Sequence, residues 1–220
     1  MKNIGAEYEN LDQKVYQIVK DMIVNRELAP GQKIPQEKLA KQLGISRTPL
    51  ISALKFLEHE KLVESKPRRG YFVRLFTEKE MIALFELREV LEGLAARRAA
   101  TLITDDECRV LEGLFSEFKG QTDITDIAAY SKADKTFHTM ITQISSREFL
   151  TAMLQTFNVI SLAYQYGHDQ GLVIHPNDTL ADHEQICKAI CSRDPEKAEA
   201  LMRSHFKKAI EILTDKIGET

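Results

Sequence analysis

The most constraining feature of this chain is a run of local signals between residues 36 and 74. A short helical segment over 36–43 meets Gly44, and glycine suits the positive φ of the residue that follows a helix. Ser46 is a candidate N-cap for a second helix, whose first turn tolerates Pro49 because the missing N–H costs little there. Two short strands around a basic turn follow. This order predicts a winged helix-turn-helix.

The second helix of this motif separates apolar from polar side chains. Leu50, Ala53 and Leu57 are spaced to pack inward, which leaves the opposite face polar. A helix of this kind fits the major groove of DNA and presents its N-terminal side chains to base edges. The sequence therefore predicts binding to double-stranded DNA. The candidate contacts are Ser46, Arg47, Thr48, Ser52 and Lys55 of the helix and Arg68, Arg69 and Gly70 of the basic turn.

Positive charge concentrates in the first part of the chain. The strands expected over 61–65 and 71–75 enclose a turn with several cations, which favours phosphate contact over ordinary turn charges. Residues 1–76 hold 14 lysines and arginines against 9 acidic residues, a net charge of +5, whereas residues 77–220 hold 16 against 24, or −8. A basic module beside an acidic one is typical of phosphate binding by one domain, although chance scatter remains an alternative.

The chain is expected to form two domains, 1–76 and 77–220, and to be mainly α. An amphipathic helix over 11–26 precedes the winged motif, and from Thr77 onward only helical periodicity is present. The second domain is therefore expected to be an antiparallel all-α bundle of about six helices. Capping boxes at Thr77 and Thr104 and the pair Asp194-Pro195 indicate three helix starts. The expected helices span about 77–100, 104–118, 124–144, 147–167, 179–192 and 195–217.

Other features point to a cytoplasmic protein. No apolar run approaches the roughly 20 residues that cross a bilayer, and the first residues lack the apolar core of a secretory signal. The three cysteines are an odd number without framework spacing, which suits a reducing compartment.

Four polar residues of the second domain fall beside apolar positions and predict a metal site. Asp134 and His138 are four residues apart and share one helix face, and His183 and His205 lie on two other expected helices. Three imidazoles and a carboxylate suit Zn²⁺, Ni²⁺ or Mn²⁺, with Zn²⁺ favoured. Ordinary core histidines, a solvated Asp–His pair and a thiolate site remain alternatives. The thiolate site would comprise His183, Cys187 and Cys191.

Several short segments together match a known pattern. They are LAPGQKI at 28–34, LGISRTP at 43–49, PRRG at 67–70, Leu87-Arg88 with Leu91-Glu92, and the four acid and histidine positions named above. With these segments the whole chain resembles the GntR family of bacterial transcription regulators, and within it the FadR-like group with an FCD effector domain. About six helices in the second domain make it similar to the shorter VanR-type branch.

The resemblance implies roles in DNA recognition. Arg47 matches an arginine that contacts operator bases, Thr48 a residue that contacts the backbone, and Gly70 the wing-tip glycine near the minor groove. Where the family usually has a second arginine, this chain has Ile51, which cannot donate to guanine O6 and N7. Losing a bidentate pair removes about 1–3 kcal/mol of discrimination. The operator is therefore expected to have an altered preference at that base pair, or weaker binding offset elsewhere.

The resemblance also implies a metal held by the acid and histidine positions, with an effector cavity beside it. Arg88 and Glu92 match cavity-facing positions, where an arginine can clamp a carboxylate, and a surface ion pair is the plain alternative. Further cavity candidates are Asn158, Tyr164 and His175.

The sequence thus favours a homodimeric transcription regulator, and repression is favoured over activation. A small organic acid would complete the metal shell and alter affinity for a pseudo-palindromic operator. One rival hypothesis is a metal-dependent hydrolase with a DNA-binding appendage, for which no general base or nucleophile motif is evident. The other is an architectural DNA-binding dimer without an effector.

Overall fold

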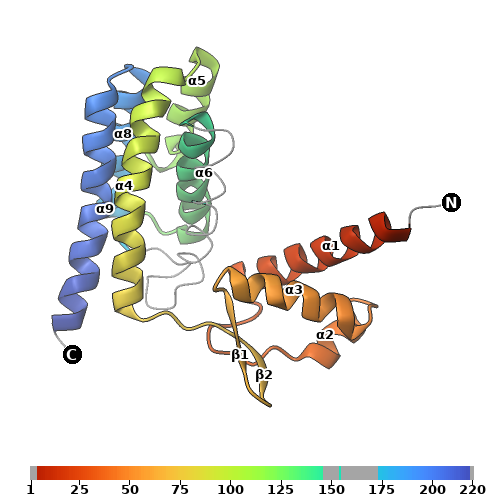
Figure 1. The fold of residues 1–220 in the computed structure, drawn as a ribbon. Coiled ribbons are helices and arrows are strands. Elements are labelled where there is room, and N and C mark those ends of the chain that lie inside the picture. Colours follow the sequence, from red (N-terminus) through yellow and green to blue (C-terminus); the bar gives the residue numbers. More distant parts are fainter. Residues whose placement is uncertain (1–3, 146–153, 155–172, 219–220) are drawn as a thin grey trace. The chain divides into compact units, whose positions relative to one another are not determined.

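A computed structural model describes residues 4–145, 154 and 173–218 of the chain. The described residues are mainly helical, which confirms the predicted fold class. They separate into two compact units between Leu75 and Phe76, one residue before the boundary expected from the sequence. Figure 1 shows the winged unit in red to orange and the helical unit in yellow to blue.

The first unit is built on three helices with a shared apolar core. They are α1 (Ile4–Val24), α2 (Gln36–Gln42) and α3 (Arg47–His59). Helix α1 begins earlier than the expected 11–26. It packs on α3, where Val19 of α1 and Leu50 and Leu54 of α3 are fully buried. This burial leaves the N-terminal polar side chains of α3 exposed.

The wing is an antiparallel pair, β1 (Val63–Lys66) and β2 (Gly70–Val73), in which Lys66 lies opposite Gly70. These strands are displaced by one or two residues from the expected ranges. A third extended segment joins the sheet, because Lys33 bridges Phe72. The Glu58 carboxylate at the end of α3 accepts hydrogen bonds from the backbone N–H and hydroxyl of Ser65, at 3.0 and 2.6 Å. The wing is therefore fastened to the helix predicted to enter DNA.

The turn between α2 and α3 confirms one sequence prediction and corrects another. Gly44 has φ +66°, the left-handed conformation expected after a helix. Ser46 is the N-cap residue of α3 and has extended backbone angles, but its side chain makes no capping hydrogen bond. The serine signal therefore located the helix start correctly, whereas the predicted side-chain contact is wrong.

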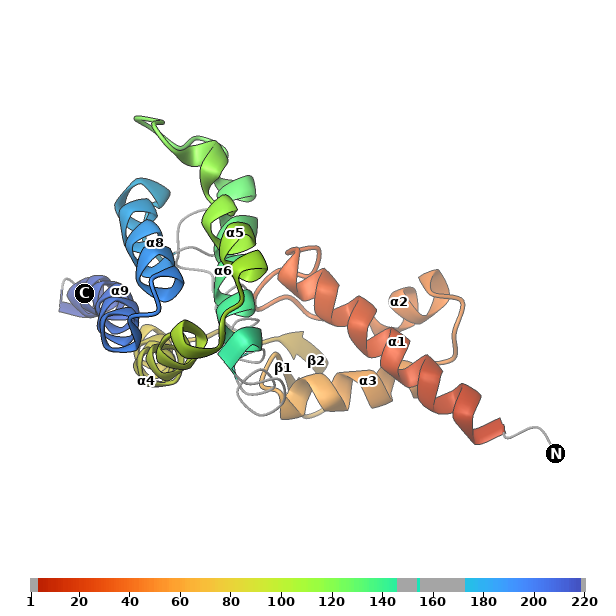
Figure 2. The same ribbon diagram turned by 90° about the horizontal axis from the view of Figure 1, so that it is seen from above.

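The regular elements in the described part of the second unit are all helices. Its elements are α4 (Glu78–Leu102), α5 (Asp105–Gly113), the short 3₁₀ helix η1 (Ser116–Phe118), α6 (Ile127–Ser145), α8 (Pro176–Cys191) and α9 (Pro195–Gly218). The single helix expected over 104–118 is divided into α5 and η1, and the helix expected over 147–167 lies outside the described residues. Helix α4 runs beside α9, as Figures 1 and 2 show, and it also contacts α6 and α8.

Three helix starts follow the sequence signals. Thr77 and Thr104 both form complete capping boxes, with Glu80 and Glu107 reaching back to the N-cap backbone. The Asp194 carboxylate accepts from the backbone N–H of Lys197 at 3.1 Å. Among the described helices, none combines the length and apolar character that a bilayer-spanning segment requires.

The positive φ at Gly44 generates a stability prediction. No heavy atom lies within 4 Å of a Cβ built at this position, so backbone strain alone will set the effect of a substitution. Gly44→Ala should destabilise the α2–α3 turn by about 1–2 kcal/mol, whereas Gly44→Asn should cost less because asparagine tolerates this conformation. Hydrogen exchange of peptides spanning residues 36–59 measures the change. Equal exchange in the two variants would contradict this explanation.

Candidate metal centre and nucleic-acid interface

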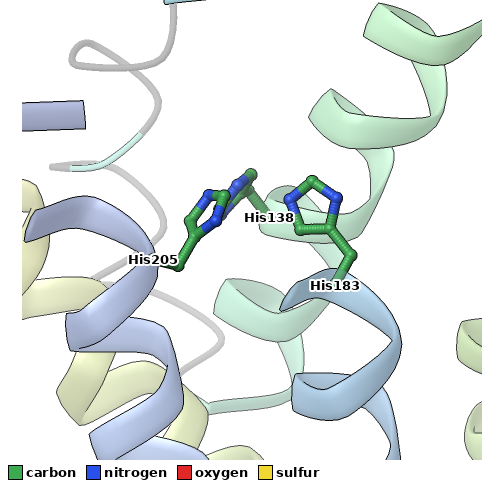
Figure 3. Close-up of side chains that lie close together, drawn as sticks. All are labelled: His138, His183 and His205. Carbon is green, nitrogen blue, oxygen red and sulfur yellow. The ribbon is translucent and has the colours of Figure 1, made fainter. Parts of the chain in front are cut away.

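Three histidines from three helices meet inside the second unit. His138 comes from α6, His183 from α8 and His205 from α9, and Figure 3 shows their rings turned toward one another. One ring nitrogen from each can be chosen so that all lie within 4.8 Å of one another. All three side chains are buried. The structure therefore brings together the three imidazoles that the sequence predicted as ligands.

Asp134 lies at the edge of this cluster, one turn before His138 on α6. Its Oδ1 is 3.3 Å from His183 Nε2 and 3.8 Å from His138 Nε2, without hydrogen-bond geometry to either. The Asp134 side chain is 24% exposed, so it forms the more open side of the cluster. Three of the four predicted ligands thus form one group of nitrogens, and Asp134 lies beside two of them, His138 and His183.

One ring nitrogen of His183 forms a hydrogen bond and the other does not. Its Nδ1 hydrogen-bonds with the Tyr130 hydroxyl at 3.0 Å, and that hydroxyl also meets Thr179 Oγ1 at 2.9 Å. Within the described part of the chain, His183 Nε2 and His205 Nδ1 are buried without a hydrogen-bond partner. Burial also lowers the pKa of both imidazoles, with that of His183 held well below its usual range.

These features fit a metal ion. Buried nitrogen atoms rarely lack a partner, and the exceptions call for an explanation. A lowered pKa keeps imidazole neutral, which is the protonation state that binds a cation. The donor set of neutral imidazoles and one carboxylate suits Zn²⁺, Ni²⁺ or Mn²⁺.

Arg88 and Glu92 form a buried pair, so the alternative of a surface ion pair is wrong. They are 6% and 1% exposed, and Arg88 Nε and Nη2 both lie 2.7 Å from Glu92 Oε1. The other oxygen of Glu92 contacts His138 Nδ1. Burial alone would raise the pKa of Glu92, but Arg88 and His138 together lower it to about 2. Glu92 is therefore a charged neighbour of a predicted metal ligand.

The remaining candidates of the second unit have other environments. Asn158 and Tyr164 lie outside the described residues. His175 is the N-cap of α8, where its ring accepts from the backbone N–H of Asn177 at 3.3 Å. Cys187 Sγ lies 3.7 Å from a backbone carbonyl of α5, and burial raises its pKa to about 12. Neither Cys187 nor Cys191 belongs to the group of candidate ligands found among the described residues, which argues against the thiolate alternative.

The predicted DNA contacts form an accessible set in the first unit. Ser46, Arg47, Thr48, Lys55, Arg68 and Arg69 are exposed, and Ser52 and Gly70 are half-buried. Arg68 has φ +61° at the wing tip, a conformation that arginine adopts only with strain. Gly70 has φ +91°, and a Cβ there would meet the Gln36 side chain at 3.0 Å. The turn thus requires glycine at 70 and keeps a strained cation at 68.

One neighbour of the predicted base-reading arginine was not found from the sequence. Arg47 Nη1 lies 3.4 Å from Glu37 Oε1 of α2, and both side chains are well exposed. The two residues are ten apart and on different helices, so no helical spacing rule connects them. Tyr130 and Asp182, which lie beside His183 and His205, were missed for the same reason.

Comparison with known proteins places both units in one family. The family described as "Bacterial regulatory proteins, gntR family" matches residues 11–73, and the FCD domain family matches residues 83–208. The chain belongs to the GntR family and carries an FCD domain. It is a DNA-binding transcription regulator and not an enzyme, because the families and relatives that it matches are transcription regulators.

Relatives align over nearly the whole chain. The Nta operon transcriptional regulator of Aminobacter aminovorans is 31% identical over 212 residues, covering 90% of this chain and 94% of that protein. The HTH-type transcriptional repressor RspR of Escherichia coli K12 is 25% identical over 202 residues, covering 91% and 88%.

Solved structures share the fold. E. coli McbR/YncC superposes with a TM-score of 0.74 at 21% identity, covering 94% of this chain and 98% of that one. A putative GntR regulator from Rhodococcus sp. RHA1 gives a TM-score of 0.76 at 19% identity, covering 93% and 97%.

The Arg47–Glu37 contact generates a prediction for DNA affinity. Glu37→Gln should strengthen DNA binding about two- to fivefold. It frees Arg47 from an exposed ion pair worth up to about 1 kcal/mol, and it removes a negative charge near DNA. Arg47→Ala should weaken binding. Fluorescence anisotropy with a duplex chosen by binding-site selection measures both effects. Glu27→Gln removes an equal charge outside the motif, and an equal gain in that control would refute the local explanation.

Proposed function

We propose that this protein is a metal-containing, ligand-responsive regulator, acting in the cytoplasm, whose affinity for its operator changes when a small organic acid binds the second unit. The single observation that carries this proposal is the convergence of three buried imidazoles, in which the unpartnered His183 Nε2 lies 3.3 Å from the Asp134 carboxylate. Three imidazoles and one carboxylate would leave positions for a further oxygen ligand on an ion that takes more than four ligands, such as Ni²⁺, Mn²⁺ or five-coordinate Zn²⁺. A carboxylate of the acid has the chemistry to fill them.

The DNA-binding half supports a repressor that recognises a pseudo-palindrome. Two relatives are named as repressors: RspR, and a probable D-xylose utilization operon repressor of Paenarthrobacter nicotinovorans that is 28% identical. We propose that Arg47 and Thr48 contact bases and backbone and that Arg68 and Arg69 follow the phosphates from the wing. Asn158 and Tyr164 remain proposed cavity residues, and the VanR-type branch remains a proposal that rests on the expected helix number.

A metal and acid titration tests this function. Added Zn²⁺ should raise the melting temperature of the wild-type protein, because a ligand at 100 times its dissociation constant stabilises by about 2.7 kcal/mol. His183→Gln should remove this shift, whereas the control His59→Gln, at an exposed position on α3, should keep it. Differential scanning fluorimetry provides the measurement.

The effector half of the proposal needs the metal-loaded protein and DNA together. A panel of dicarboxylates and hydroxy acids should contain a compound that lowers anisotropy of a bound operator duplex in the wild type but not in His183→Gln. Indifference to all acids with metal bound would contradict effector control and favour an architectural role.

We further propose that two copies meet through an apolar stripe on α4, which comprises Leu87, Val90 and Leu94. These side chains are 53, 49 and 41% exposed, and their spacing of three and four residues places them on one helix face. Glu86 precedes the stripe and Arg98 ends it, both exposed, so an antiparallel second copy of α4 would match opposite charges. An exposed stripe of this kind marks a contact surface.

The stripe predicts an assembly defect. The double variant Leu87→Asp/Leu94→Asp should be monomeric because it places four carboxylates in the apolar contact between two copies. The control Val110→Asp carries the same change at a 57% exposed position on α5 and should remain dimeric. Light scattering coupled to gel filtration measures the mass. A dimeric double variant would exclude this surface.

A further inference from the structure

We infer that Glu92 is a positioning residue for the metal centre, which holds the His138 ring so that Nε2 serves as the ligand atom, with Arg88 as its counter-ion. This inference rests on the metal site proposed above. It assigns the buried Arg88–Glu92 pair a role other than clamping an effector.

The two oxygens of Glu92 are divided between two partners. Oε1 accepts from Arg88 Nε and Nη2, and Oε2 contacts His138 Nδ1. An ionised carboxylate only accepts hydrogen bonds, so the proton of this contact lies on Nδ1 and the lone pair of a neutral ring lies on Nε2. His138 Nε2 is the nitrogen that lies 3.8 Å from Asp134 Oδ1. A carboxylate behind a ligating imidazole fixes both the ring orientation and its tautomer.

Arg88 is held in place by aromatic rings as well as by charge. Its guanidinium carbon lies 4.7 Å from the ring centre of Phe206 and 5.4 Å from that of Phe85. An effector carboxylate that took Arg88 would have to displace Glu92, which is 1% exposed and would remain as a buried charge. Removing one partner from a buried pair is strongly unfavourable. The arrangement therefore favours Arg88 as a permanent partner of Glu92.

The other two imidazoles have different supports, which makes Glu92 distinctive. His183 is supported by the neutral hydroxyl of Tyr130. His205 Nδ1 lies 3.7 Å from Asp182 Oδ2, beyond hydrogen-bond distance, and that carboxylate is bound by Lys208 at 2.7 and 2.8 Å. Among these three rings, His138 is the one that hydrogen-bonds to a carboxylate outside the predicted ligand set.

The test compares metal affinity in full-length variants. Glu92→Gln should weaken Zn²⁺ binding by about 10- to 100-fold, the usual effect of losing a partner behind a ligand. Glu89→Gln is the matched control, because it makes the same change on α4 and breaks the Glu89 contact with Arg203 at 3.4 Å. Competition with a fluorescent zinc chelator measures affinity. The visible absorption bands of bound Co²⁺ should change in Glu92→Gln and remain unchanged in Glu89→Gln.

A second variant separates positioning from folding. Arg88→Met/Glu92→Gln removes both buried charges together and should fold, as judged by circular dichroism, yet show the same loss of zinc affinity as Glu92→Gln. Wild-type affinity and Co²⁺ bands in the Glu92 variants would overturn the inference while leaving the metal site intact. A wild-type protein that binds neither Zn²⁺ nor Co²⁺ would instead overturn the proposed metal site itself.

Discussion

The second unit depends on the way three buried imidazoles are satisfied. A polar nitrogen in an apolar interior is costly unless it has a partner. His138 of α6 meets Glu92 of α4, and His183 of α8 meets Tyr130 of α6, so side-chain contacts join these helices pairwise. One ring nitrogen from each of these two histidines and one from His205 of α9 lie within 4.8 Å of one another. Helix packing thus builds a donor set in advance, and a cation there would stabilise the folded state.

Local rules predicted the elements well, and contacts between elements poorly. The capping boxes at Thr77 and Thr104 need only neighbouring residues, so sequence alone located them. The Asp134–His138 spacing placed two ligands on one face for the same reason. The spacing of Arg88 and Glu92 is identical in an exposed pair and in a buried one, and only packing against α6 and α9 decides between them. Spacing also cannot reveal the contact of Glu92 with His138, 46 residues away.

Helix α4 contributes to three features of the proposed mechanism. It follows the wing after the short link 74–77, it carries Glu92 to the histidine cluster, and its opposite exposed positions form the apolar stripe. A ligand changes DNA affinity only by binding two arrangements of the protein unequally. Because α4 carries Glu92 and the stripe and begins directly after the link, a small movement of this helix would change the positions of all three. The proposed metal centre is therefore built partly on the helix that residues 74–77 join to the DNA-binding unit.

The proposed DNA-binding surface contains an ion pair that bears on sequence discrimination. In the free unit Arg47 is already paired with Glu37, and contact with a base must replace that pair. An exposed pair of this kind holds at most about 1 kcal/mol, whereas a bidentate contact with guanine returns about 1–3 kcal/mol. If Arg47 reads a base as proposed, guanine returns more free energy than the ion pair holds, whereas a base without paired acceptors returns too little. The proposed phosphate contacts of the wing do not involve this pair, so Glu37 would act on discrimination as well as on general attraction.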